Sequence, residues 1–339
     1  MTDISTAEVP GGTALTTDTS VVPTARSLAR RRRLSALIPV ITLIVLLAIV
    51  SIAQPSFLGI GALQGQLVQA APILVLAVGL TPVILLGCID LSIGALASLS
   101  AVLLAIFTPG LGMVGVVIVI AAAAATGALV GFVQSFAQIP SFVVTLGALG
   151  VYSGLALVLS GATSKPLGAG AASIAWLGGT VALIPVSFLI GIVLIFVLGW
   201  ALHATTWGRR LYALGAGEPA SIMSGISPRR VRVAAFAVSG GSAALAACFL
   251  VARTSYASPT MADAYLLPAL AAVLVGGTAI SGGVGSVWRT LCGALIIVVL
   301  QAGLVVMGFD PVVLNLAFGV LVVVAVAVTT DRRKLSVIK

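Results

Sequence analysis

The sequence predicts an all-α polytopic membrane protein with about ten transmembrane helices. Of its 339 residues, 60% are hydrophobic and only 7% are charged, and the mean hydropathy is +1.27. A soluble domain carries about 25% charged residues, so this chain lacks the polar surface that would cover a water-soluble core. The composition also excludes disorder over most of the length. The 38 glycines suit helices that pack closely in lipid, where small residues let two backbones approach each other.

Ten apolar segments are interpreted as membrane spans, each needing about 20 residues to cross. The first follows a run of arginines and is too long for the apolar part of a signal peptide. Two of the segments, 91–107 and 268–281, are short and adjoin glycine-rich stretches, so we expect interrupted helices there. The ten expected spans are 34–53, 66–86, 91–107, 113–133, 141–160, 181–202, 232–252, 268–281, 290–308 and 312–330.

Lysine and arginine positions predict how the chain is oriented. The net charge is +9, from 17 Lys+Arg against 8 Asp+Glu. With an even number of spans and a cytoplasmic N-terminus, every cation except Lys165 and Arg253 falls on the cytoplasmic side. Membrane proteins show this bias toward cytoplasmic cations. An odd number of spans would place one cationic terminus outside.

The expected spans divide the chain into three parts. Residues 1–33 are predicted to be a disordered cytoplasmic tail, 34–331 the transmembrane domain, and 332–339 a cytoplasmic C-terminal tail. The domain includes a long cytoplasmic loop at 203–232. The cations flank apolar segments and accompany no soluble fold, so we expect the lipid bilayer as a partner and no nucleic acid.

The apolar body offers no set of residues for catalysis or metal binding. It has one histidine, His203, which suits the end of a helix, and three separated cysteines, Cys88, Cys248 and Cys292, which suit packing. No lysine stands in the G-x-x-x-x-G-K-[ST] pattern of a phosphate-binding loop. We therefore expect no catalytic residue, metal or cofactor on this chain, and any step that needs ATP would require a partner.

The segment 87–94, Gly-Cys-Ile-Asp-Leu-Ser-Ile-Gly, places a carboxylate between two apolar spans. A charged aspartate at the centre of a spanning helix costs about 2.5–3.5 kcal/mol. Gly87 and Gly94 permit a helix break, and Asp90 or Ser92 could cap the helix that follows. Two interpretations stay open at this point. Asp90 either orients the break or contacts a transported solute directly.

The segment 276–286 contains five glycines and cannot form an ordinary helix interior. Irregular backbone at membrane depth is buried in protein or lines a cavity. Four of ten positions agree when 274–283 is aligned with 85–94, which raises the idea of an internal repeat without establishing it. The residues of this segment that we expect at the helix break or along a solute path are Gly276, Gly277, Thr278 and Ser281.

The loop 203–232 contains a short predicted helix. Pro219 suits a first helical turn and Gly225 suits a helix end. A helix of about two turns on the cytoplasmic face could dock in the groove of a partner. The alternative is a solvated loop that only carries orienting arginines. The residues expected to contact such a partner are Glu218, Pro219, Ala220, Ser224, Gly225 and Ile226.

These three segments together resemble the permease subunits of ribose-type ABC importers, the monosaccharide and autoinducer group of the branched-chain-permease-like superfamily. The family pattern G-G-I-D-L-S-x-G matches 87–94 except at Cys88, and G-G-T-S-x-x-G-G-x-G-S matches 276–286 except at Ala279. The pattern G-R-x-x-Y-A-x-G-x-N-x-x-A begins at 208, with Gly217 in place of asparagine, and a Ser-Gly-Ile follows at 224–226. The resemblance covers roughly 34–334.

The resemblance implies a type II ABC importer permease fold and a division of labour among subunits. Two permease chains, identical or homologous, would form the pathway, and separate ATPase subunits would bind ATP and Mg. The helix near 218–226 would couple this chain to an ATPase. An extracytoplasmic sugar-binding protein would dock on outward loops such as 160–180 and 253–267. The assembly would import a small neutral sugar, a related polyol or an autoinducer across the bacterial cytoplasmic (inner) membrane.

One departure from the family pattern concerns specificity. Family members usually carry an acidic residue shortly before Gly-Gly-Thr, whereas 265–268 here reads Tyr-Leu-Leu-Pro. A particular sugar therefore cannot be transferred from the resemblance. Two alternatives remain. A branched-chain amino-acid ABC permease is disfavoured by the Asp90-Leu91-Ser92 motif. An ion-coupled secondary transporter needs intramembrane ion ligands, and one aspartate makes a poor relay.

Overall fold

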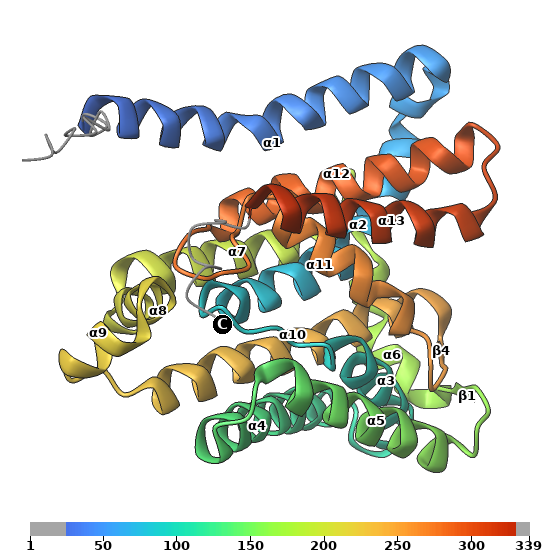
Figure 1. The fold of residues 1–339 in the computed structure, drawn as a ribbon. Helices are drawn as coiled ribbons and strands as arrows, with labels where there is room; N and C mark the ends of the chain where they lie inside the picture. Colours follow the sequence, from blue (N-terminus) through green and yellow to red (C-terminus); the bar gives the residue numbers. More distant parts are fainter. Residues whose placement is uncertain (1–24, 330–339) are drawn as a thin grey trace, which may run out of the picture.

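The computed structural model describes residues 25–329 and is built mainly of helices (Figure 1). The long helices are α1 (Ala25–Ala53), α2 (Ile60–Leu85), α3 (Ile93–Leu111), α4 (Met113–Ala137), α5 (Ser141–Ser160), α7 (Val186–Ala204), α10 (Pro228–Thr254), α12 (Val287–Val306) and α13 (Pro311–Thr329). The shorter ones are α6 (Ala171–Ile174), α8 (Thr206–Ala216), α9 (Glu218–Met223) and α11 (Leu266–Val275). Each of the ten predicted spans overlaps one helix.

Seven of the described helices are long and apolar enough to cross a membrane, namely α2, α3, α4, α5, α7, α10 and α12. Two shorter apolar stretches accompany them, Leu37–Ala53 within α1 and Asp263–Val275. The predicted class is therefore confirmed: the protein is a helical, polytopic membrane protein. The other three predicted spans correspond to α1, α11 and α13.

Short strands and single turns of 3-10 helix connect the long helices. Strand β1 (Lys165–Pro166) pairs antiparallel with β4 (Tyr256–Ala257), and β2 (Thr180–Val181) pairs with β3 (Ile184–Pro185). The all-α prediction contains none of these strands. The 3-10 turns are η1 (Pro55–Leu58), η2 (Gly168–Gly170), η3 (Ala175–Gly178) and η4 (Asp263–Tyr265).

Several element boundaries differ from the prediction. The span expected at 181–202 begins only at Val186, because the β2–β3 hairpin precedes it. Helix α3 continues to Leu111 and is not short. The segment 268–281 is confirmed as a short helix, since α11 ends at Val275.

The N-terminal boundary also differs. Helix α1 begins at Ala25, so 25–33 lie in a helix and not in the expected tail. Arginine is a good helix former, which suits this extension. The other residues of the two predicted tails lie outside the described part of the chain.

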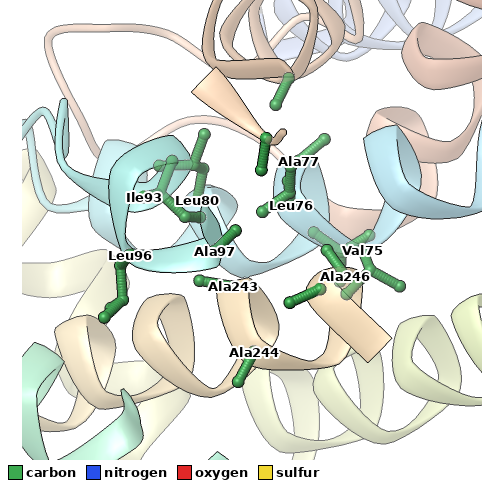
Figure 2. Close-up of a cluster of buried hydrophobic side chains, with 14 of the residues drawn as sticks. Val75, Leu76, Ala77, Leu80, Ile93, Leu96, Ala97, Ala243, Ala244 and Ala246 are labelled. Carbon is green, nitrogen blue, oxygen red and sulfur yellow. The ribbon is translucent and has the colours of Figure 1, made fainter. Parts of the chain in front are cut away.

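The core lies where α2, α3 and α10 meet, as the cluster in Figure 2 shows. Every residue of α2 from Ala70 to Leu85 is buried. Glycines bring α10 unusually close to α4. A Cβ added at Gly127 would lie 2.2 Å from the Phe236 carbonyl oxygen, and one at Gly240 would lie 2.1 Å from the Ala123 carbonyl oxygen. Small residues thus permit the backbone contact that membrane helices favour.

The bundle has two distinct ends (Figure 1). Helices α8 and α9 lie at one end, and the β1–β4 pair lies at the other, as does the turn between α12 and α13. Helix α1 packs on α12 along the outside of the bundle. The ends are therefore different in structure, and the three sequence motifs can be placed relative to them.

Candidate functional site

The three motif segments meet near α8. The Gly283 N–H donates a hydrogen bond to the Leu85 carbonyl at 2.8 Å, and the Tyr212 hydroxyl donates to the Gly285 carbonyl at 3.0 Å. Burial raises the pKa of Tyr212 above its ordinary value, so the phenol stays protonated as a donor at neutral pH. We call this contact the motif junction and define it as 85–87, 212–215 and 282–285.

Gly215 stands at the centre of the motif junction. A Cβ on Gly215 would lie 1.9 Å from the Leu85 carbonyl oxygen and 2.5 Å from the Gly283 nitrogen. Gly282 and Gly283 have φ values of +82° and +75°, in the left-handed region that favours glycine. Any side chain at position 215 would force α8 away from both glycine-rich segments.

The first break begins where α2 ends. Gly87, with φ +72°, donates its N–H to the Ile84 carbonyl at 2.9 Å, and the Cys88 N–H reaches the Val83 carbonyl at 3.1 Å. This pair of bonds is a Schellman motif, which satisfies the last carbonyls of a helix. Gly87 therefore terminates α2, as the sequence predicts.

The second break ends α11 in the same way. Gly277, with φ +86°, donates to the Leu274 carbonyl at 2.9 Å, and the Thr278 N–H donates to the Val273 carbonyl at 3.2 Å. The residue equivalent to Gly87 is therefore Gly277, one position from the match that the sequence alignment proposes. Either glycine of the Gly276-Gly277 pair can be aligned with Gly87 in sequence, and only the backbone conformation shows that Gly277 is the equivalent residue.

The other predicted residues of the second segment serve packing or face outward. A Cβ on Gly276 would lie 2.6 Å from the Arg289 carbonyl oxygen, so this glycine lets α11 approach α12. Thr278 is buried, and its hydroxyl has no hydrogen-bond partner within the described residues. Ser281 is exposed. A solute path along this segment stays a prediction.

Asp90 is buried and fully hydrogen-bonded. Its Oδ1 accepts from the Ser92 N–H at 2.9 Å and from the Ser92 hydroxyl at 2.6 Å, and its Oδ2 accepts from the Ser239 hydroxyl at 2.6 Å. The carboxylate thus closes a turn and ties the first break to α10. This arrangement favours the interpretation in which Asp90 orients the break.

Of the two residues expected to cap α3, Asp90 accepts a backbone N–H at the helix start, that of Ser92, whereas Ser92 does not cap. Ser92 occupies the N-cap position, but its side chain makes no capping bond. Its hydroxyl donates a hydrogen bond to the Asp90 carboxylate. Gly94 lies inside the first turn of α3 and allows close packing, since an added Cβ would lie 3.2 Å from the Ala262 carbonyl oxygen.

The short helix expected in the long loop is confirmed as α9. Pro219 lies in its first turn, and Gly225, with φ +77°, follows its end. Met223 is 89% exposed and Ile222 49%, whereas Ser221 is 6% exposed. Helix α9 therefore presents an apolar tip to its surroundings while its other face packs on the chain. Ala220, Ser224 and Ile226 complete the predicted contact set, which remains a prediction.

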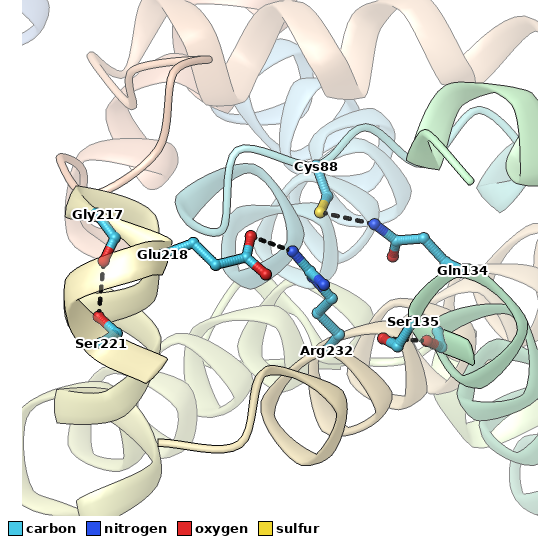
Figure 3. A network of polar contacts seen from close by, with 8 residues as sticks. Cys88, Gln134, Ser135, Gly217, Glu218, Ser221 and Arg232 are labelled. Carbon is cyan, nitrogen blue, oxygen red and sulfur yellow. Dashed lines mark hydrogen bonds and ion pairs between the residues drawn. The ribbon is translucent and has the colours of Figure 1, made fainter. Parts of the chain in front are cut away.

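Glu218 is engaged within the chain. Its Oε2 lies 2.5 Å from Nη2 of Arg232 on α10, as Figure 3 shows. The Glu218 side chain is 41% exposed and the Arg232 side chain is 19% exposed. Sequence reasoning placed Arg232 only among the orienting cations and missed this pairing. No local pattern signals a partner 14 residues away across a turn.

A cleft of about 710 Å³ lies beside this ion pair. The first break, the turn between α4 and α5, α9 and the start of α10 line it. Gln134 on its wall donates to the Cys88 sulfur at 3.3 Å (Figure 3), and its Oε1 is buried without a partner in the described chain. Arg229 stacks over the Phe132 ring at 4.1 Å. Sequence reasoning also missed Gln134.

Broken spanning helices fastened to a short exposed helix form the architecture of a membrane transport permease rather than of an enzyme. Comparison with known families agrees with this class. The model of the family described as "Branched-chain amino acid transport system / permease component" matches residues 62–327, so the chain belongs to that family. Within the described residues, no three His, Cys, Asp or Glu side chains are grouped to hold a metal ion.

Several relatives resemble the chain over most of its length. It is 38% identical over 304 residues to the ribose import permease protein of Bacillus subtilis (strain 168), covering 87% of this chain and 92% of the relative. It is 35% identical over 303 residues to the ribose import permease protein of Escherichia coli (strain K12), an alignment that covers 86% of this chain and 93% of the relative. It is 31% identical over 313 residues to the fructose import permease protein of Rhizobium meliloti, an alignment that covers 89% of this chain and 87% of the relative. No solved structure matches.

Proposed function

We propose that this chain is the permease of an ABC importer that brings a small neutral sugar into the bacterial cytoplasm. A pentose, a hexose or a related polyol or autoinducer fits the class. Separate ATPase subunits with ATP and Mg drive the cycle, an extracytoplasmic binding protein delivers the sugar, and a second permease chain, identical or homologous, completes the path. The names of the ribose and fructose import permeases support the substrate class.

The motif junction is the observation that carries this proposal. Helix α9 exposes an apolar tip, and α8 joins it to both helix breaks through the close contact at Gly215. A force applied to α9 by an ATPase would therefore pass through α8 to the end of α2 and to the glycine-rich segment between α11 and α12. Packed contacts of this kind are one physical route by which coupling passes between distant sites.

The distribution of charge supports a cytoplasmic position for α8 and α9. Arg209 and Arg210 lie in α8, whereas Lys165 lies in β1 at the opposite end of the bundle and Arg253 lies in the last turn of α10. The described chain begins and ends toward the α8–α9 end (Figure 1). Both termini are then cytoplasmic, as the bias toward cytoplasmic cations requires.

The opposite end suits the binding protein. Its two expected docking loops, 160–180 and 253–267, are joined by the β1–β4 pair. Trp176 and Tyr256 in these loops are 52% and 54% exposed. Aromatic side chains of this kind are enriched in protein interfaces.

Crosslinking tests the coupling role of α9. The chain would be purified with its ATPase after Cys88, Cys248 and Cys292 are replaced by alanine, and single cysteines would then be introduced. We expect Met223→Cys to crosslink to the ATPase and Ser221→Cys, which is buried on the same helix, not to crosslink. Sugar-loaded binding protein should stimulate ATP hydrolysis in the same preparation.

The opposite result is equally defined. If no ATPase associates and uptake collapses when the ion gradient is dissipated, the ABC importer proposal is wrong. Asp90 would then be the leading candidate for ion coupling.

A branched-chain amino acid is the second candidate solute, because the family description names that class. Competition separates the two candidates. Uptake that unlabelled ribose or fructose suppresses and leucine does not would support the sugar. The reverse pattern would establish the amino acid.

A further inference from the structure

A second cavity, of about 330 Å³, is bounded by the turn after α1, by α2 and by the last turns of α12. The end of α1 lies at the opposite end of the bundle from α8 and α9 (Figure 1). None of the residues that line the cavity, all within the described chain, is charged. We call it the glutamine cavity, after its polar lining residues Gln54, Ser56, Gln66, Gln69 and Gln301.

The glutamines lie within the apolar helices and not only at their tips. Gln66 and Gln69 are three residues apart on α2 and therefore share a face. Gln69 is nine residues beyond Ile60, or about 13 Å at 1.5 Å per residue. Gln301 is five residues before the end of α12, or about 7 Å. Gln69 and Gln301 thus lie inside the apolar stretches of α2 and α12, near the helix ends that adjoin the turn after α1.

Two of these amides lack a partner in the chain. Gln54 donates to the Ser56 hydroxyl at 2.9 Å, and Gln66 donates to the Phe57 carbonyl at 3.3 Å. Gln69, which is exposed, and Gln301, which is partly exposed, make no side-chain hydrogen bond within the described residues. An unpaired amide at membrane depth is unfavourable unless water or a ligand satisfies it. Both side chains line the cavity and are accessible, so their amides are available to bond to water or to a ligand there.

The lining selects one chemical class of ligand. Each amide offers one acceptor oxygen and two donor hydrogens, which complement hydroxyl groups that both donate and accept. With no charged lining residue, the cavity holds no counter-ion for the carboxylate and ammonium of an amino acid or for a phosphate. Its volume lies at the small end of ligand pockets, about 300–1,000 Å³, which suits one sugar ring and not an oligosaccharide.

We propose that the glutamine cavity binds one neutral, polyhydroxylated molecule of monosaccharide size on its way from the binding protein into the membrane. This inference rests on the proposed function, in which the sugar arrives at this end of the bundle. Gln69 and Gln301 are the residues that contact the sugar.

Uptake by the complete transporter in proteoliposomes tests the site, with D-ribose and D-fructose as probes. Gln69→Leu and Gln301→Leu each remove one amide at similar volume. We expect each to raise the sugar concentration at half-maximal uptake by about threefold to tenfold, as the loss of one neutral hydrogen bond predicts. Gln64→Leu is the matched control, because Gln64 lies on the same helix, bonds to the Leu183 carbonyl and does not line the cavity.

Thiol protection gives a readout that does not depend on how the leucine variants fold. In the cysteine-free chain, Gln69→Cys would be labelled with a small neutral thiol reagent in the folded transporter. We expect D-ribose or D-fructose to slow the labelling at position 69, and to leave the labelling of Gln64→Cys unchanged.

The outcomes separate the two proposals. Leucine variants with unchanged uptake, or labelling at position 69 that neither sugar slows, would overturn the glutamine cavity and leave sugar import intact. A wild-type transporter that imports leucine and neither sugar would instead overturn the proposed function, and this inference with it.

Discussion

The two helix breaks end their helices alike but are held in place by different means. Polar side chains hold the first break: Asp90 bonds to Ser239, and the Ile89 N–H donates to the Ser141 hydroxyl at 3.0 Å. Backbone contacts hold the second: the Ala279 N–H donates to the Val284 carbonyl at 2.8 Å, in addition to the bond from Gly283 to Leu85. The first break should therefore be sensitive to lost polar groups, and the second to added volume.

The largest effect is expected at the contact where both breaks meet α8. Gly215→Ala places a methyl group where the Leu85 carbonyl lies, and overpacking costs about 1–3 kcal/mol or more, so we expect uptake to fall by at least about tenfold. Sugar uptake at equal membrane expression is the measurement. Gly217→Ala is the control, because nothing lies within 4 Å of its added Cβ. Equal uptake by Gly215→Ala and wild type would contradict the motif junction.

The next effect is expected at the first break. Asp90→Ala leaves the hydroxyls of Ser92 and Ser239 without their acceptor. We expect the free energy of unfolding to fall by about 2–3 kcal/mol, the magnitude for bonds to a charged group. Thermal unfolding in detergent measures the change. A double-mutant cycle with Ser239→Ala isolates the bond, and strictly additive losses would contradict it.

A smaller effect is expected at the ion pair between α9 and α10. Partly exposed ion pairs contribute about 0.2–1 kcal/mol, so Arg232→Gln should leave the fold intact. We expect it to lower the stimulation of ATP hydrolysis by the loaded binding protein, because α9 loses its link to α10. The charge-exchanged pair Glu218→Arg with Arg232→Glu should recover part of the stimulation. Failure of Arg232→Gln to change the stimulation would assign the pair no role in coupling.

The smallest effect is expected in the second break. Thr278→Val replaces an unpartnered buried hydroxyl by a methyl group of similar size. Removing an unsatisfied polar group is neutral or stabilising, so the thermal midpoint should stay the same or rise slightly. A clear loss of stability would show that side chains hold the second break after all.

Much of the fold can be predicted because its signals are local. Apolar runs of membrane length identify the spans. Pro219 as a helix-start signal and Gly225 as a helix-stop signal identify α9. The Gly-rich stretches mark the neighbourhood in which α2 and α11 end, although only the structure shows that Gly87 and Gly277 terminate them. Each of these signals acts within a few residues of the structure that it specifies.

The parts that sequence reasoning missed depend on distant contacts. Asp90 and Ser239 are 149 residues apart, and the contact between Gly215 and Leu85 has no trace in either local segment. The two outer loops joined by β1 and β4 carry no strand-like pattern. Gln69 and Gln301 were missed because polar candidates were sought within the three motif segments, whereas these neutral amides line the glutamine cavity outside those segments.

The motif junction has one consequence for how such a transporter can be retuned. Its central contacts join main-chain atoms of Leu85, Gly215 and Gly283, so they contain no ionisable group and no variable side chain. High ionic strength should weaken the partly exposed Glu218–Arg232 pair but not this contact. Substitutions that alter which solute is carried can accumulate at the other end of the bundle while the drive mechanism stays the same. In the proposed importer, the contact that couples the ATPase to the helix breaks is thus physically separate from the cavity that receives the sugar.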